Sequence, residues 1–274
     1  MKSRNNVYLL LLSLFSLTAC TDVVDVDLEK SEPLLAVDGQ ITDQPGPYTV
    51  RLSTTASYFS NTTTPAVTNA TVVIRDSEGV SETLKQTTPG VYVTSQLRGK
   101  VGHKYTLTVK ADGQEYTAET EIRRVFPLDS IAAEFRKESL GQEEGYYLKI
   151  YGQEIAGKGD SYRWKVYRND SLLSKPADLI FFDDLYIDGN YLNGIALGNG
   201  PFKKGDKIRV ENLSLTDDAY QYIVEIFNNT AATGGLFSNP PANVRTNIRN
   251  VAPNGKKAVG WFNGSAVRRV EKTI

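Results

Sequence analysis

The sequence is poor in the residues on which many catalytic and metal sites depend. Its 274 residues include one cysteine, Cys20, and one histidine, His103. A single cysteine excludes a disulfide framework and a cysteine-based zinc site, and a single histidine leaves little room for a histidine-based triad. The G-x-S-x-G elbow, the P-loop, the dinucleotide-binding glycine fingerprint and H-E-x-x-H are also missing. We therefore expect a protein that is not an enzyme and carries no cofactor.

Charge of one sign is lacking as well. The chain has 31 lysines and arginines against 32 aspartates and glutamates, a formal net charge of -1. Nucleic-acid binding requires a clustered basic excess. We therefore expect no nucleic acid among the partners.

Long hydrophobic runs are missing too, and the longest one lies near the start of the chain. The segment Val7 to Leu17 is apolar over 11 residues, whereas a membrane-spanning helix needs about 20. With two basic residues before it, this pattern predicts a signal peptide over residues 1–19. The next residue, Cys20, ends a lipobox, in which small residues precede a cysteine. We predict cleavage before Cys20 and lipidation of its thiol, including fatty acylation such as palmitate, as the membrane anchor.

Residues 20–32 then form a predicted lipidated acidic tether. Asp22, Asp25 and Asp27 closely follow Cys20. This arrangement resembles the export signal that sends lipoproteins of Bacteroidota to the outer face of the outer membrane. The resemblance implies a lipid-anchored outer-membrane protein exposed on the cell surface; a plain acidic tether is the alternative.

From residue 33 onward, short strand patterns alternate with turn residues. Apolar and polar side chains alternate at Tyr48–Ser53 and again at Tyr105–Lys110, the period of a half-buried strand. Repeated short strands without a helical period favour an all-β chain. We expect an immunoglobulin-like or transthyretin-like β-sandwich over residues 33–124.

A second β-rich domain is predicted over residues 125–274. In the strand around Trp164, the residues Tyr162, Trp164 and Val166 should face one side, and Arg163, Lys165 and Tyr167 the other. One amphipathic helix is expected at about 216–229, because Thr216 can cap it and apolar residues follow at spacings of three and four.

Two groups of residues on one predicted hairpin are candidate binding residues. The aromatic group comprises Phe181, Phe182, Tyr186 and Tyr191. It could stack on a sugar or contact a protein partner. The alternative is that these aromatics are core on one face of the hairpin and ordinary surface on the other, which is the more common arrangement. The acidic group, Asp183, Asp184 and Asp188, offers oxygen ligands for a cation such as Ca²⁺. The spacing of an EF-hand loop is missing, so a hairpin turn with solvated acids is the alternative, and we assign no metal to these residues.

A carboxylate-based hydrolase would need two acids about 5–10 Å apart in a cleft. Glu143 and Glu144 are adjacent in a glycine-bounded loop, which should project them apart. We therefore expect no catalytic residues from this pair.

Several segments together resemble a large family of uncharacterised Bacteroidota lipoproteins, catalogued as a domain of unknown function. The segments are the lipobox, Leu35–Asp43, Val50–Thr55, Ala70–Val72, Gly90–Tyr92, Gly102–Leu107, Phe237–Asn243 and Gly260–Phe262. Residues 65–110 separately resemble a transthyretin-like or carboxypeptidase-regulatory β-sandwich. The family resemblance supplies no catalytic residues.

The resemblance implies a role beside a TonB-dependent receptor, because genes of the family often lie next to genes for such receptors. We expect a lipid-anchored, non-enzymatic surface protein that serves as an accessory or binding partner of a TonB-dependent β-barrel receptor in nutrient uptake. The alternative is a structural or adhesion module of the cell envelope that binds no small ligand.

Overall fold

A computed structural model describes residues 32–56, 63–231 and 243–274 of the chain. The predicted signal peptide, Cys20 and nearly all of the predicted tether lie outside the described residues. Residues 33–274 form one compact unit. Within the described ranges, no helix has both the length and the apolar character needed to cross a membrane.

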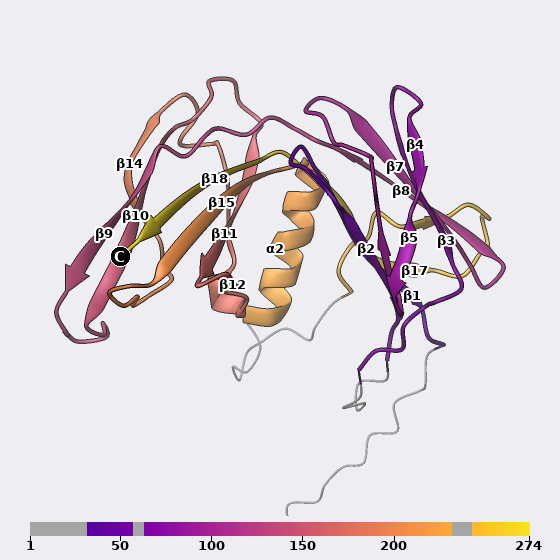
Figure 1. The fold of residues 1–274 in the computed structure, drawn as a ribbon, viewed down its shortest axis with the longest axis horizontal. Helices are drawn as coiled ribbons and strands as arrows, with labels where there is room; N and C mark the ends of the chain where they lie inside the picture. The colour runs from indigo at the N-terminus through magenta and orange to yellow at the C-terminus, as the bar shows by residue number, and fades with distance from the viewer. Residues whose placement is uncertain (1–31, 57–62, 232–242) are drawn as a thin grey trace, which may run out of the picture. The chain divides into compact units, whose positions relative to one another are not determined.

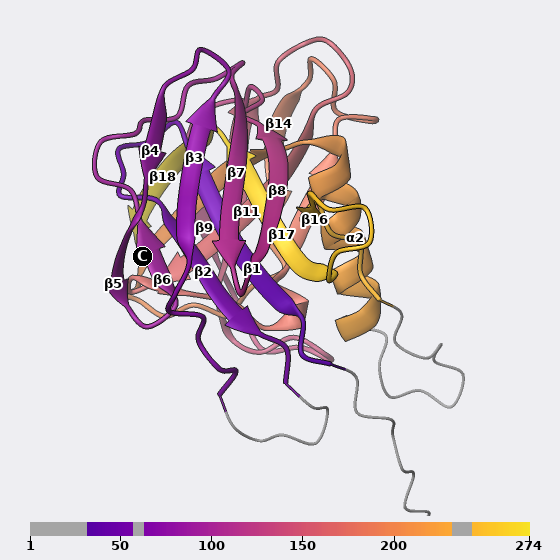
Figure 2. The ribbon, with the colours of Figure 1, turned by 90° about the vertical axis from the view of Figure 1, so that its right-hand side faces the viewer.

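Two five-stranded sheets form a sandwich built largely from the N-terminal half. The first contains, in order, β17 (Ala258–Ser265), β1 (Leu35–Thr42), β2 (Thr49–Thr54), β6 (Val91–Val93) and β5 (Lys85–Thr88). The second contains β16 (Arg249–Asn250), β8 (Gln114–Glu121), β7 (Lys104–Ala111), β3 (Thr71–Asp76) and β4 (Ser81–Thr83). Figure 2 shows β3, β7 and β8 lying over β1, β2 and β17.

Alternating side chains explain the core of this sandwich. In β1 the buried residues Val37 and Ile41 belong to the same hydrophobic cluster as Ile74 of β3 and Leu107 of β7. Each strand therefore turns one face inward and leaves its other face for polar side chains.

Two further sheets follow along the chain. One contains β12 (Ser171–Leu172), β11 (Ser161–Arg168), β15 (Lys207–Leu215) and β18 (Val267–Thr273), with β13 (Ile180–Asp183) also paired to β11. The other contains β14 (Tyr191–Ala196), β10 (Gly145–Gln153) and β9 (Ser130–Arg136). A short 3₁₀ helix, η2, spans Pro176–Asp178.

The helix α2 (Asp217–Ala231) follows β15 directly and is the one α-helix in the described ranges. The Thr216 hydroxyl accepts a hydrogen bond from the Ala219 N–H at 3.2 Å, which caps the first turn. Ala219 and Ile223 then pack on Leu215 and on Trp261 of β17. Figure 1 shows α2 beside β11 and β15. The predicted all-β class, with a β-sandwich and one helix, is confirmed.

The last strands connect the two groups of sheets. β17 pairs in parallel with β1, and β16 pairs with β8, so residues after 125 join sheets formed mainly by residues before it. After Ala266 the chain enters β18, which pairs with β15. The division into domains at residue 125 stays a prediction.

Candidate functional site

The candidate site is a cleft whose walls belong to two different sheets. One wall is the outer face of β1, β2 and β17. Because Val37 and Ile41 point into the sandwich core, alternation places Asp38 and Gln40 on the opposite face of β1. Both of these side chains line the cleft.

The other wall is formed by β11, β15 and α2. Tyr162 and Trp164 of β11 are buried in the core, so Arg163 and Lys165 face the cleft. Leu213 of β15 lies opposite Arg163 in the sheet register and also lines the cleft. The sequence predicted the two faces of this strand, and the structure places the polar face against another sheet.

The cleft consists of two adjoining pockets. The pocket next to α2 has a volume of about 450 Å³, and the pocket next to β18 has a volume of about 770 Å³. They share the lining residues Asp38, Gln40, Arg51, Lys165 and Leu213. Volumes of roughly 300–1,000 Å³ are usual for small-molecule sites, so each part is large enough for a ligand.

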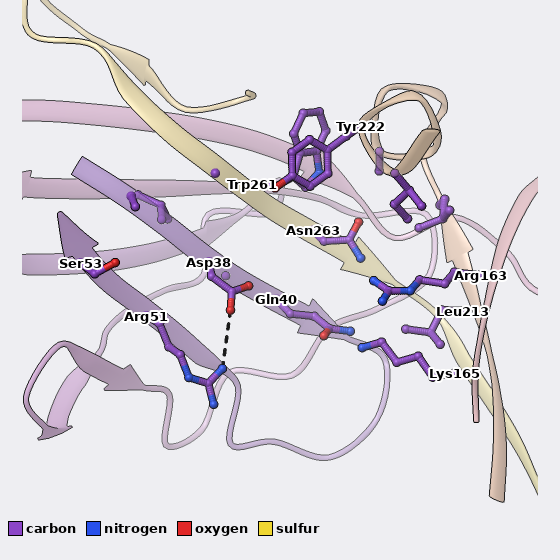
Figure 3. Close-up of a pocket in the computed structure, with 17 residues that line it drawn as sticks. Asp38, Gln40, Arg51, Ser53, Arg163, Lys165, Leu213, Tyr222, Trp261 and Asn263 are labelled. Carbon is purple, nitrogen blue, oxygen red and sulfur yellow. Dashed lines mark ion pairs between the residues drawn. The ribbon is translucent and has the colours of Figure 1, made fainter. Parts of the chain in front are cut away.

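Two cations dominate the polar side of the cleft. Figure 3 shows Arg163 and Lys165 projecting toward Gln40 and Asn263 on the opposite wall. Neither cation forms an ion pair with a carboxylate of the described residues. The cleft therefore presents unpaired positive charge.

The two carboxylates of the cleft have other partners. Asp38 lies 3.7 Å from Arg51 on its own sheet. Glu211 is opposite Lys165 in the register of β15, but it pairs with Arg209 at 3.3 Å and accepts a hydrogen bond from Tyr167 at 3.1 Å.

Burial lowers the pKa of both cations. Desolvation is the main cause of the lowered pKa of Lys165, and the positive charge of Arg163 lowers that pKa further. Desolvation also lowers the pKa of Arg163, although a guanidinium stays charged at physiological pH. A negatively charged group placed between them would offset both effects.

The end of the cleft near α2 is apolar. Trp261 is only 8% exposed and is covered by Tyr222, whose ring stacks on it with centroids 4.7 Å apart. The Nε1 of Trp261 and the Oδ1 of Asn263 are buried and have no hydrogen-bond partner among the described residues. Buried polar atoms usually have partners, so these two atoms stand out among the residues that line the cleft.

A buried junction at Ala266 sets the separation of the two walls. The Ser265 hydroxyl donates to the Ser214 carbonyl at 2.7 Å, and the Ala266 N–H donates to the Ser214 hydroxyl at 2.8 Å. Ser265 and Ala266 have no exposed surface. These bonds join β17 of one wall to β15 of the other.

The structure separates the four aromatic residues that the sequence proposed as a contact group. Phe182 packs edge-on against Trp164 at 4.9 Å in the core, and Phe181 packs against Tyr220 of α2 at 5.8 Å. Tyr186 and Tyr191 are 87% and 49% exposed. None of the four lines the described cleft, and contact of the two tyrosines with a partner stays a prediction.

The three candidate acids are also separated. Asp183 accepts a hydrogen bond from the Leu185 N–H at 3.2 Å, and Asp188 accepts one from the Gly157 N–H at 2.6 Å. Asp184 instead lies with Glu154 and Asp160, and one carboxylate oxygen of each falls within 4.8 Å of the others. Glu154 and Asp160 were not predicted from the sequence, because they flank a loop that is distant in sequence from Asp184.

These three buried carboxylates are the set that could hold a divalent cation. Glu154, Asp160 and Asp184 are 1%, 3% and 4% exposed. Arg124 donates to Asp160 at 2.7 Å, Tyr162 donates to Glu154 at 2.6 Å, and the Asp160 N–H donates to Asp184 at 2.9 Å. These bonds already satisfy much of the cluster, and burial together with the Glu154 contact raises the pKa of Tyr162.

His103 belongs to a second acidic group, with Asp76 and Glu78. Its ring nitrogens lie 3.9 Å and 3.6 Å from those two carboxylates. Asp76 also accepts hydrogen bonds from the N–H groups of Glu78 and Val80, each at 2.9 Å. The group therefore closes the turn after β3.

Comparison with known proteins assigns the family. The family described as "Domain of unknown function (DUF4249)" matches residues 21–271, and the chain belongs to it. No curated protein matches the chain significantly. Among solved structures, a two-domain fibronectin type-III segment of chicken tenascin is 11% identical, with 68% of this chain and 92% of that chain covered and a TM-score of 0.21.

Proposed function

We propose that this member of the DUF4249 family is a lipid-anchored, non-enzymatic binding protein on the outer-membrane surface. In this proposal it serves as an accessory of a TonB-dependent receptor in nutrient uptake. The anchor rests on the lipobox that ends at Cys20. The binding role rests on one observation, the continuous cleft between the outer face of β1 and the polar face of β11.

The residues of the cleft support binding rather than chemical conversion. Among the described residues that line it there is no histidine and no cysteine. Its carboxylates, Asp38 and Glu211, are each paired with an arginine. A carboxylate that acts as a general base needs to be free and within hydrogen-bond reach of the substrate, and each of these two carboxylates has an arginine beside it.

A lipid anchor would compensate for a low affinity of the cleft for its ligand. Confinement to a membrane surface raises the effective concentration of the protein near a receptor in the same membrane. A cleft of modest affinity could therefore deliver a nutrient efficiently. The alternative, a structural or adhesion module, would not need a cleft lined by unpaired cations.

The test is capture of the full-length lipoprotein, expressed with its leader in its native host, from detergent-solubilised outer membranes. We expect a β-barrel receptor to be recovered with it and radiolabelled palmitate to enter the wild-type chain but not Cys20→Ser. A chain without label would refute the anchor. Capture without any β-barrel receptor would refute the accessory role and favour the structural alternative.

A further inference from the structure

The part of the cleft near α2 contains several hydrogen-bond donors without partners. The donors are the guanidinium of Arg163, the ammonium of Lys165 and the buried Nε1 of Trp261. The Oδ1 of Asn263 is the unpartnered buried acceptor among the described cleft residues. A ligand that satisfies this set has to be rich in acceptor atoms.

We propose that the cleft binds a small organic anion, whose carboxylate or phosphate group lies between Arg163 and Lys165 and whose apolar body lies toward Tyr222 and Leu213. The inference rests on the proposed function, because it names the class of ligand that such a binding protein would take. Charge-assisted hydrogen bonds to carboxylate or phosphate are among the strongest that proteins form.

The placement of the two cations favours one shared anion over separate solvation. They are two residues apart on one face of β11, and Figure 3 shows both side chains extending into the same space. Each is partly buried, so water solvates it incompletely. Gln40 and Asn263 reach the same space from β1 and β17 and add amide groups that can orient the bound group.

The charges around Lys165 are mixed, but the positive ones are in excess. The charged and titratable groups that line the cleft with it are Asp38 of β1, Tyr48, Arg51 of β2, Arg163 and Tyr167 of β11, Glu211 of β15, Tyr222 of α2 and Arg269 of β18. Both acids among them have an arginine partner already. A bound anion would therefore face the two unpaired cations of β11.

The apolar lining next to these cations argues for an organic anion rather than a bare inorganic one. Ala36 and Tyr222 line this end of the cleft and are half-buried. Apolar surface that a ligand covers contributes roughly 25 cal/mol per Å². Affinity should therefore be higher for an anion that carries a ring than for its inorganic counterpart.

The experiment is isothermal titration of the folded, soluble Cys20→Ser chain lacking its leader with four probes. Phenyl phosphate and benzoate represent the two possible anionic groups, inorganic phosphate tests the need for an apolar body, and benzyl alcohol tests the need for charge. We expect one or both aromatic anions to bind at least tenfold more tightly than inorganic phosphate and benzyl alcohol. Which of the two binds better distinguishes a phosphate ligand from a carboxylate ligand.

A matched pair of double variants tests the location. R163Q/K165Q removes two positive charges from the cleft, whereas R249Q/K257Q removes two from exposed positions outside it. We expect the first to weaken binding at least tenfold and the second to weaken it less than twofold. Equal weakening would overturn the proposal, because it would show unspecific charge attraction. Thermal unfolding and near-ultraviolet circular dichroism confirm that both variants fold.

The pH dependence adds a readout that a structural role would not change. Affinity should fall as the pH rises toward 10, because Lys165, with its lowered pKa, loses its proton at a lower pH than an ordinary lysine. K165R should retain affinity over that range. A flat profile in the wild type would contradict the role of Lys165.

The outcomes separate this inference from the proposed function. If the receptor is captured but no aromatic anion binds, the anion inference fails and the accessory role stands. If anions bind and no receptor is captured, the accessory role fails and the anion site stands. If R163Q/K165Q loses receptor capture while the wild type binds no anion, the cleft is a receptor-docking surface and the anion inference is wrong.

Discussion

Tyr222 of α2 stacks on Trp261 of β17, with ring centroids 4.7 Å apart and planes inclined by 19°. The contact links the helix that follows β15 to the sheet that contains β1. It also covers Trp261, which is only 8% exposed. The stack therefore closes the apolar end of the cleft. Its loss should be measurable as a change in the exposure of Trp261.

Tyr222→Ala should destabilise the protein by about 1–3 kcal/mol, because it removes an aromatic pair and partly uncovers Trp261. Urea unfolding measures the loss, and a red shift of tryptophan fluorescence measures the exposure. Trp164, the other tryptophan, is buried at 3% exposure and should not change. The control is Tyr186→Ala at an 87% exposed position, which should change stability by less than about 0.5 kcal/mol. Similar losses in both variants would contradict a structural role for the stack.

Glu82→Gln should weaken the N-terminal sandwich and alter its response to acid. Burial alone would raise the pKa of Glu82, but hydrogen bonds from Ser95, Leu97 and Gln96 outweigh it and hold the pKa below its usual value. A lowered pKa gives stability that is present above about pH 4.5 and is lost as the pH falls through the folded value. We expect a loss of about 1–3 kcal/mol at pH 7 that shrinks in acid, measured by urea unfolding at several pH values.

Glu78→Gln is the matched control for that experiment. Glu78 is 57% exposed and pairs with Lys100 at 3.0 Å, and exposed pairs of this kind contribute about 0–1 kcal/mol. A loss at Glu78 as large as the loss at Glu82 would show that the backbone hydrogen bonds to Glu82 are unimportant.

Gly260→Ala should destabilise the parallel pairing of β1 with β17. Gly260 has a φ of +100°, and a Cβ at this position would lie 2.0 Å from the Val37 carbonyl oxygen. Backbone strain and the clash together should cost at least about 2 kcal/mol, which thermal unfolding would reveal. Gly102→Ala, at φ +85° with nothing within 4 Å of its Cβ, carries the strain without the clash and should cost less. If the two costs are equal, close approach to Val37 is not the reason for glycine at 260.

The alternation of side chains made the strand faces predictable, and it was most informative in β11. The buried positions of Tyr162, Trp164 and Val166 follow from the period of two. The N-terminus of α2 was also predictable, because Thr216 caps it through a local hydrogen bond. Both features depend on neighbours within a few residues, which the sequence displays directly.

The cleft was not predictable, because it depends on which sheets face each other. From the sequence alone, the polar face of β11 is indistinguishable from ordinary solvent-exposed surface. In the structure, β17 and β18, connected at Ala266, join the sheet of β11 to the sheet of β1. The grouping of Glu154 with Asp184 depends in the same way on long-range contacts. The available signal was two cations, Arg163 and Lys165, that alternate with Tyr162, Trp164 and Val166 in one strand.

Lys165→Met should stabilise the free protein at pH 7 while it weakens anion binding. Desolvation and Arg163 lower the pKa of Lys165, so in the folded chain its charged form is less favourable than in the unfolded chain. Between the lowered value and about 10.4 the unfolded state binds more protons, so the stability of the wild type rises with pH through that window. The variant lacks this rise, and its advantage in urea unfolding should therefore shrink from pH 7 to pH 10. An advantage that stays constant with pH would show that the methionine acts through packing alone. A variant less stable than the wild type at pH 7 would mean that the ammonium has a stabilising partner in the free protein, and the cleft would then lack the unpaired charge from which anion binding was inferred.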